Sequence, residues 1–246
     1  MTKFLIDADI VAFKAAVSTE RPIDWGDGFW TLHAHEAEGV EYIHKYLHRI
    51  TSTIGDGDFH MFITDPENWR KDVLPSYKSN RKGTRKPLTL NALRQYLLAE
   101  MSAVMVKGME ADDLLGITST NEPDCVIVSE DKDLATIPGK LFNPAKDEEV
   151  RTISEFDADY LHMKQTLTGD PVDGYAGLAG CGEKTAEKIL DGCETVKEMW
   201  AAVVKAYSKK KLSEEVALTQ ARVARICRAS DFDFNTGKVI LWKPPT

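Results

Sequence analysis

The chain has 246 residues, of which 43% are hydrophobic and 28% are charged, a composition typical of a folded globular protein. Its net charge of −8, taken alone, argues against nucleic-acid binding. No apolar stretch is long enough to span a membrane, and no signal-peptide pattern follows Met1. The four cysteines have no CxxC spacing, so we expect reduced cytoplasmic thiols and exclude a disulfide framework and a zinc site.

The first half of the chain alternates between short apolar runs and helical patterns, which favours a parallel β-sheet. Runs typical of strands cover residues 3–6, 59–63, 104–106 and 125–128. Helical periodicity covers residues 10–17, 36–54, 90–103 and the segment that follows residue 113. Residues 20–31 indicate a loop or irregular hairpin, residues 141–153 short strands, and residues from 154 onward an all-helical region.

Acidic residues follow the four predicted strands of this first half. They are Asp7 with Asp9, Asp65, the cluster of Glu110, Asp112 and Asp113, and Asp131 with Asp133. Helix capping explains one acid in a first turn, but three within four residues repel each other unless a cation or basic partner is present. Because parallel strands end at one edge of the sheet, we expect these acids to converge there.

Each acidic motif, taken by itself, is compatible with more than one role. Asp7 and Asp9 suit a helix cap, metal binding or phosphate chemistry. A DxD pattern after a first strand is also found in haloacid-dehalogenase phosphatases, in which the first Asp is the nucleophile. If the negative charge is held in one metal-filled pocket, the outer surface of the chain can still be basic.

A basic stretch follows Asp65. Seven basic residues between positions 68 and 86 face one acid, Asp72, with Trp69 and Tyr77 interleaved. Basic residues with aromatic ones suit a phosphate backbone and unstacked bases, although a basic run is usually only a solvated face. The predicted DNA contacts of this stretch are Arg70, Tyr77, Lys78, Arg81 and Lys82.

A Gly-rich segment in the helical region is the second nucleic-acid signal. Glycines in a tight turn between helices allow backbone N–H groups to approach a phosphate closely. Two lysines follow one helical turn apart, so the segment favours binding of a DNA backbone without sequence specificity over an ordinary helical hairpin. The predicted contacts are Gly177, Gly180, Gly182, Lys184, Thr185 and Lys188.

In this order, the motifs resemble those of the 5′-nuclease family: flap endonucleases, phage 5′–3′ exonucleases and the 5′-nuclease domains of bacterial DNA polymerases. The matching motifs span residues 3–190: Leu-Ile-Asp7, Asp65, Pro-x-Tyr77-Lys78-x-Asn-Arg81, Glu110-Ala-Asp112-Asp113, Ser129-x-Asp131-Lys132-Asp133 and Gly169-Asp170-x-x-Asp173. The chain departs from the family pattern at Glu130, Val172, Gly174 and Cys181, and none of these changes removes a carboxylate.

The resemblance implies an α/β fold in two parts. Residues 1–153 would form a PIN-like nuclease core with a parallel sheet and a basic arch at about residues 66–90. Residues 154–246 would form a helical DNA-binding region with a helix–three-turn–helix motif at about residues 169–191.

The resemblance also implies a structure-selective 5′ nuclease that uses two Mg²⁺ ions, which Mn²⁺ can replace. Its implied first-ion ligands are Asp7, Asp65, Glu110 and Asp112, and its second-ion ligands are Asp131, Asp133, Asp170 and Asp173. Asp113 would be an outer ligand, and Lys78, Arg81 and Asp131 would act in catalysis. A monovalent ion would bind at the helix–three-turn–helix.

The implied partner is duplex DNA with a free 5′ end or a 5′ flap, and RNA–DNA primer junctions are a further candidate. We expect a monomer without membrane contact, in the cytoplasm of a bacterium or of a phage-infected cell. Two other functions stay open from the sequence. One is a phosphatase of the haloacid-dehalogenase type, and the other is a DNA-binding protein without catalysis.

Overall fold

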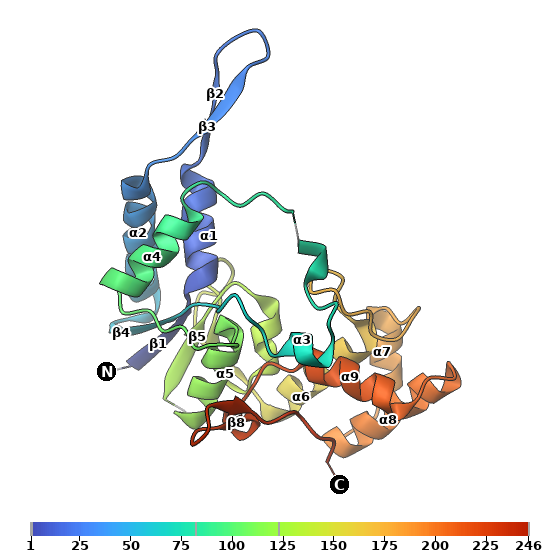
Figure 1. Ribbon diagram of the computed structural model, residues 1–246. Coiled ribbons are helices and arrows are strands. Elements are labelled where there is room, and N and C mark those ends of the chain that lie inside the picture. The colour runs from blue at the N-terminus through green and yellow to red at the C-terminus, as the bar shows by residue number, and fades with distance from the viewer. Residues whose placement is uncertain (1, 82, 123, 246) are drawn as a thin grey trace.

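A five-stranded sheet forms the centre of the computed structural model, which describes residues 2–81, 83–122 and 124–245 (Figure 1). Its strands lie in the order β4 (Gly57–Phe62), β1 (Thr2–Asp7), β5 (Cys125–Val128), β6 (Gly139–Phe142) and β7 (Arg151–Ile153). All neighbours pair in parallel except β6 and β7. The predicted parallel sheet is therefore confirmed, with one antiparallel edge strand added.

Both faces of the sheet are covered, because alternate residues of a strand point to opposite sides. Phe4 and Ile6 of β1 pack against α1 (Ala8–Thr19), α2 (Glu36–Ile54) and α4 (Leu90–Glu100). Leu5 packs on the other face, against α5 (Ala111–Asn121). The helices therefore hold the ends of β1, β4 and β5 in a fixed arrangement.

The C-terminal part, predicted to be all-helical, is mainly helical but also contains two short strands. Its helices are α6 (Glu155–Thr168), α7 (Glu183–Leu190), α8 (Val196–Lys209) and α9 (Glu214–Ala224), and they share an apolar core of their own. The chain then returns to the sheet: Ile226 and Cys227 join the apolar cluster beneath α5, followed by the short strands β8 (Phe232–Asp233) and β9 (Lys238–Val239). No helix among the described residues is long and apolar enough to cross a membrane.

Two segments differ from their sequence-based descriptions. Residues 104–106 do not form a strand, since only Val104 makes a bridge, to Phe62. The segment after α1 is a regular antiparallel hairpin of β2 (Arg21–Asp24) and β3 (Trp30–His33), which projects from the body of the molecule (Figure 1).

The segment predicted as an arch connects β4 to α4. It contains the short helix α3 (Arg70–Val73) and a 3-10 helix at Ser79–Arg81. Two further 3-10 helices cover Lys132–Thr136 and Ala229–Asp231. Lys82, a predicted DNA contact, lies outside the described residues.

Candidate functional site

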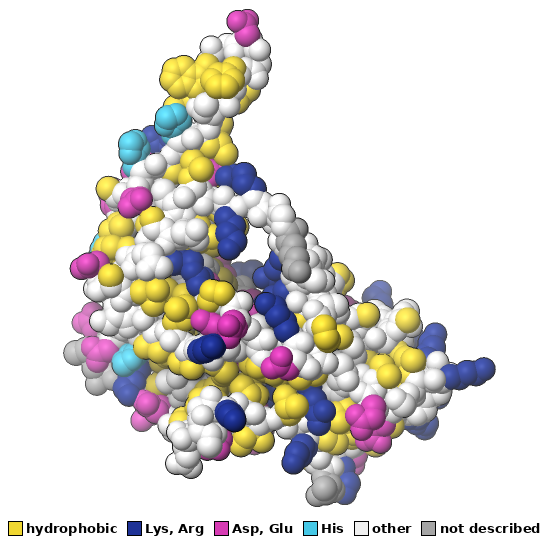
Figure 2. Space-filling model, viewed as in Figure 1, with side chains coloured by type: hydrophobic (Ala, Val, Ile, Leu, Met, Phe, Trp, Pro, Cys, Tyr) yellow, Lys and Arg dark blue, Asp and Glu magenta, His cyan; other side chains and the backbone are white. Residues whose placement is uncertain are grey.

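One large cavity, of about 1220 Å³, lies at the carboxyl ends of the central strands. Figure 2 shows an opening beneath the arch, with basic side chains around it. The cavity brings together most of the residues predicted for the site: Asp7, Asp65, Arg70, Tyr77, Lys78, Arg81, Glu110, Asp112, Asp131, Asp133, Asp170 and Asp173. Every acid predicted to converge on this sheet edge lines the cavity except Asp113, but Asp65 and Asp9 have separate partners within it.

Asp7 ends β1 and caps α1, because its Oδ1 accepts a hydrogen bond from the Ile10 N–H at 3.2 Å. Its Oδ2 accepts a hydrogen bond from the Ser129 hydroxyl, also at 3.2 Å. The side chain is nearly inaccessible to solvent. Burial, together with the negative charge of Asp131, raises the pKa of Asp7 to about 6.

Like Asp7, the nearby carboxylates of Asp112, Asp131 and Asp133 form no ion pair with a basic side chain among the described residues. Burial and the charges of Asp7 and Asp131 raise the pKa of Asp112 well above its ordinary value. Burial and the charge of Asp131 raise the pKa of Asp133 to about 6, while its Oδ1 accepts a hydrogen bond from Gln165 Nε2 at 2.8 Å.

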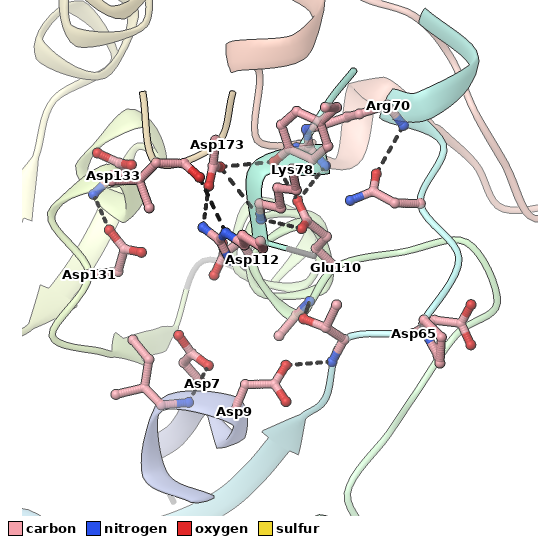
Figure 3. A pocket seen from close by; sticks show the side chains of 18 of the residues that line it. Asp7, Asp9, Asp65, Arg70, Lys78, Glu110, Asp112, Asp131, Asp133 and Asp173 are labelled. Carbon is pink, nitrogen blue, oxygen red and sulfur yellow. Dashed lines mark hydrogen bonds and ion pairs between the residues drawn. The ribbon is translucent and has the colours of Figure 1, made fainter. Parts of the chain in front are cut away.

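Glu110 and Asp173 differ from this group, because basic side chains neutralise them. Glu110 pairs with Lys78 and with Arg70, whose Nη1 lies 3.0 Å from Oε2. Although burial opposes it, these two cations lower the pKa of Glu110. Asp173 pairs with Arg81 and lies 3.5 Å from the Lys78 ammonium group. Figure 3 shows Lys78 between the two carboxylates.

Lys78 is held in its place by an uncommon backbone conformation. Its φ of 53° is in the left-handed region, which costs free energy in a residue with a side chain. The Lys78 N–H donates a hydrogen bond to the Asp173 carbonyl at 2.8 Å, which stabilises the turn. Gly174 allows this approach: a Cβ there would lie 3.3 Å from the Lys78 nitrogen.

Arg70 and Asp113 form a buried ion pair, so two predictions are wrong. Arg70 is 2% exposed, and its Nη1 and Nη2 donate to Asp113 at 2.8 and 2.7 Å. It also donates to the carbonyls of Val223 and Arg225, which leaves no access for DNA. Asp113 is fully buried and accepts further hydrogen bonds from Trp69 Nε1 and the Cys227 N–H, so it is not a metal ligand in this arrangement.

Tyr77 does not have the predicted base-stacking position either. It is 3% exposed, and its hydroxyl lies 3.0 Å from Glu110 Oε2 and 2.9 Å from Asp173 Oδ2. The ring packs beneath the cavity with Tyr175 and Val223. Its contacts indicate that it positions the two carboxylates.

Asp65 lies apart from the other acids, although it lines the same cavity (Figure 3). Its Oδ1 accepts hydrogen bonds from the N–H groups of Glu67 and Gly108 at 3.0 and 3.1 Å. Asp9 lies closer to Asp7, but its Oδ1 pairs with Arg94 and its Oδ2 accepts from the Thr64 N–H at 2.7 Å. The geometry therefore does not place Asp65 or Asp9 with Asp7 around one point.

The cavity fits divalent cations by its chemistry. As the side chains stand, no group of three or more His, Cys, Asp or Glu residues in the described ranges could hold a metal ion. However, Asp7, Asp112 and Asp133 all have raised pKa values caused by burial and by neighbouring acids. Cations would relieve this repulsion, and carboxylate oxygens are the ligands that Mg²⁺ prefers.

The predicted DNA contacts of the Gly-rich segment lie outside the cavity, in the turn between α6 and α7 and on α7 itself. The Gly177 N–H donates to Gln220 Oε1 at 2.8 Å, so it is not directed at a phosphate and that prediction is wrong. Gly177 is needed for packing, since a Cβ there would lie 2.3 Å from the Gly169 nitrogen. The other predicted contacts are exposed: Gly180, Gly182, Lys184, Thr185 and Lys188.

The sequence did not indicate two polar residues of the cavity, Gln165 and Arg94. Gln165 lies on α6 and contacts Asp133, and Arg94 lies on α4 and contacts Asp9. Both occur within amphipathic helices, where a single polar residue is ordinary. Only their contacts with residues far away in the sequence distinguish them, so the sequence offers no signal for either.

Comparison with known proteins places the chain among nucleases. It is 28% identical to the exonuclease of Escherichia phage T7, over 98% of this chain and 93% of the relative. It is 27% identical to the flap endonuclease Xni of Shewanella sp. (strain W3-18-1), over 66% of this chain and 69% of the relative.

Solved structures show the same fold. The T5 D15 protein co-crystallised with metal ions has a TM-score of 0.64 at 16% identity, covering 91% of this chain and 89% of the other. The bacteriophage T5 D15 flap endonuclease in complex with DNA and metal ions has a TM-score of 0.61 at 17% identity, with the same coverage. Residues 2–163 match the family described as "5′-3′ exonuclease, N-terminal resolvase-like domain", and the chain therefore belongs to this family.

Proposed function

We propose that this chain is a structure-selective 5′ nuclease that hydrolyses DNA phosphodiesters from or near a 5′ end, as an exonuclease, a flap endonuclease or both. The observation that carries the proposal is the position of Lys78 and Arg81 among the carboxylates of one cavity. Basic side chains in contact with carboxylates suit a site that must bind a phosphate group and metal ions together. Membership of the exonuclease family supports the same reaction and gives no support to the phosphatase alternative.

Two divalent ions, Mg²⁺ or Mn²⁺, would be held by the carboxylates. We assign Asp7, Glu110 and Asp112 to one ion and Asp131, Asp133, Asp170 and Asp173 to the other, with Asp65 acting through water. The donor set has oxygen atoms and no thiol or imidazole, which favours hard cations. Bound ions of this kind supply an activated water molecule and stabilise the leaving oxygen.

The basic side chains would act on the scissile phosphate. Lys78 and Arg81 each contact a carboxylate, and both line the cavity wall at the arch. A phosphate that enters beneath the arch would take over these contacts and have its negative charge neutralised. Tyr77 would keep Glu110 and Asp173 in position during this exchange, because its hydroxyl contacts both.

The duplex part of the substrate would bind along residues 180–188, which form the end of the turn after α6 and most of α7. The exposed glycines and lysines among them suit a phosphate backbone, and a monovalent ion at this turn is part of the proposal. Substrates would be duplexes with a free 5′ end or a 5′ flap, and RNA–DNA primer junctions, bound by a monomer.

Cleavage of 5′-labelled blunt duplex and 5′-flap DNA, with Mg²⁺ or with EDTA, tests this proposal. Wild type is compared with Asp131→Asn and Lys78→Ala, and Lys45→Ala is the control because Lys45 is an exposed lysine that pairs only with Glu41 on α2. We expect Mg²⁺-dependent cutting that Asp131→Asn abolishes and that Lys78→Ala slows by about 100-fold or more. Cutting that persists in EDTA contradicts the mechanism, and binding without cutting indicates a non-catalytic DNA-binding protein.

A further inference from the structure

Asp9 and Arg94 bind the backbone N–H and the backbone carbonyl of Thr64. Asp9 Oδ2 accepts a hydrogen bond from the Thr64 N–H at 2.7 Å, and Arg94 Nη2 donates one to the Thr64 carbonyl at 2.6 Å. The two side chains also form an ion pair with each other through Arg94 Nη1 and Asp9 Oδ1. The Asp9 carboxylate, the Arg94 guanidinium group and the backbone of Thr64 thus form a closed ring of hydrogen bonds, which we call the Thr64 clasp.

The Thr64 clasp joins segments that carry acids of the site. Asp9 lies two residues after Asp7 on α1, and Thr64 precedes Asp65. The Thr64 hydroxyl accepts a hydrogen bond from the Ala111 N–H at 3.0 Å, at the start of α5 between Glu110 and Asp112. Three acid-bearing segments therefore meet at one residue.

Arg94 connects this residue to the arch. It lies in the second turn of α4, which begins at Leu90, directly after the described span 83–89 of the arch. The arch is thus tied at its C-terminal end to the backbone that carries Asp65. The arginine and aspartate side chains are 25% and 23% exposed, so solvent screens their contact only in part.

We propose that Arg94 and Asp9 are positioning residues that set the spacing of the catalytic carboxylates relative to the arch. This inference rests on the proposed nuclease function. This role needs no contact with substrate or metal, because both oxygens of Asp9 and both Nη atoms of Arg94 make their hydrogen bonds within the Thr64 clasp. The geometry of a guanidinium group is essential here, and a lysine cannot donate two such hydrogen bonds in a fixed plane.

Arg94→Lys, Asp9→Asn and the double variant test the proposal, with kcat and the dissociation constant for flap DNA in EDTA as readouts. We expect each single variant to lower kcat by about 10- to 100-fold, since small displacements of reacting groups have effects of this size. DNA affinity should change by less than about twofold, and the double variant should be no worse than the single ones. Arg151→Lys is the matched control, because Arg151 pairs with Asp147 away from the cavity, and it should leave kcat unchanged.

Two results of these kinetic and binding measurements overturn the proposal. In the first result, Arg94→Ala weakens DNA binding, Arg94→Lys restores it, and kcat is unchanged. This result indicates that Arg94 contacts a phosphate directly. Multiplicative losses in the double variant indicate that the two residues act separately.

Hydrogen exchange gives a readout that is independent of cleavage. In Arg94→Lys, the amides of residues 62–65 and 108–113 should exchange faster, while those of α2 should keep their protection. Equal loss of protection in α2 indicates a general structural role and contradicts the proposal. If the wild type does not cleave DNA, the proposed function fails, but the exchange result still decides whether the Thr64 clasp orders these segments.

Discussion

Replacement of Asp113 by Asn distinguishes a structural acid from a metal ligand. Asp113 accepts five hydrogen bonds: two from Arg70 at 2.7 and 2.8 Å, and one each from Trp69 Nε1 at 3.0 Å, the Cys227 N–H at 3.0 Å and the Glu110 N–H at 3.4 Å. An Asn side chain has the same shape, but its NH₂ group must face one of these donors. The change also leaves the buried guanidinium group with Glu110 as its only acidic partner.

The expected loss in the free energy of unfolding is about 3–5 kcal/mol, the usual result of removing one partner from a buried ion pair. For a chain of this size, such a loss lowers Tm by about 6–20 °C. Urea denaturation in EDTA measures it without any contribution from metal binding. Asp72→Asn is the control, because Asp72 is exposed on α3 and its loss should cost less than about 0.5 kcal/mol. If Asp113→Asn keeps wild-type stability but needs far more Mg²⁺ for cleavage, the structural interpretation is wrong.

Three further predictions each depend on the surroundings of a single residue. Burial holds the pKa of His162 well below its ordinary value of 6.5, so the unfolded state binds the proton more readily and unfolding becomes easier as pH falls. In urea titrations below about pH 6.5, wild type should therefore lose up to about 1.4 kcal/mol per pH unit more than His162→Gln, and equal slopes would contradict this. Gly177→Ala should lower the urea midpoint more than Gly180→Ala, because both glycines have positive φ but only Gly177 meets backbone at 2.3 Å; equal losses would argue against this close approach. Glu20 accepts hydrogen bonds from Arg85 and from the Leu88 N–H, so Glu20→Ala should speed trypsin cleavage after Arg85, and an unchanged rate would show that this contact does not hold the arch.

The sequence was sufficient for elements whose pattern is strong and local. The helix predicted at residues 36–54 and the strand predicted at residues 125–128 have these bounds in the structure. The strand predicted at residues 104–106 failed for a non-local reason. Its composition suits a strand, but only Val104 reaches β4 before the chain turns at Lys107 and Gly108. Composition cannot show how far a partner strand extends.

The acids of the site could be identified from the sequence, but their partners could not. Glu110, Asp112 and Asp113 lie at the start of α5, where each residue is rotated by about 100° from the one before. That rotation directs Asp112 to the cavity and Asp113 to the interior, where Arg70 meets it. Arg70 itself belongs to a stretch of basic residues, and nothing in the sequence distinguishes it from the basic residues of that stretch that are exposed. Only the tertiary contact with Asp113 separates the structural arginine from the basic residues of the cavity.

The distribution of these partners also explains how an acidic chain can present a site for DNA. Net charge describes the field far from the surface, whereas binding depends on the charges that a phosphate meets within a few ångströms. At the arch side of the cavity, Lys78 and Arg81 neutralise Glu110 and Asp173, so the wall there is not strongly negative. The excess negative charge lies deeper, at residues such as Asp7, where burial and like charges raise the pKa values. A polyanion can therefore approach the arch, and the acids behind it are the place where cations would gain most from binding.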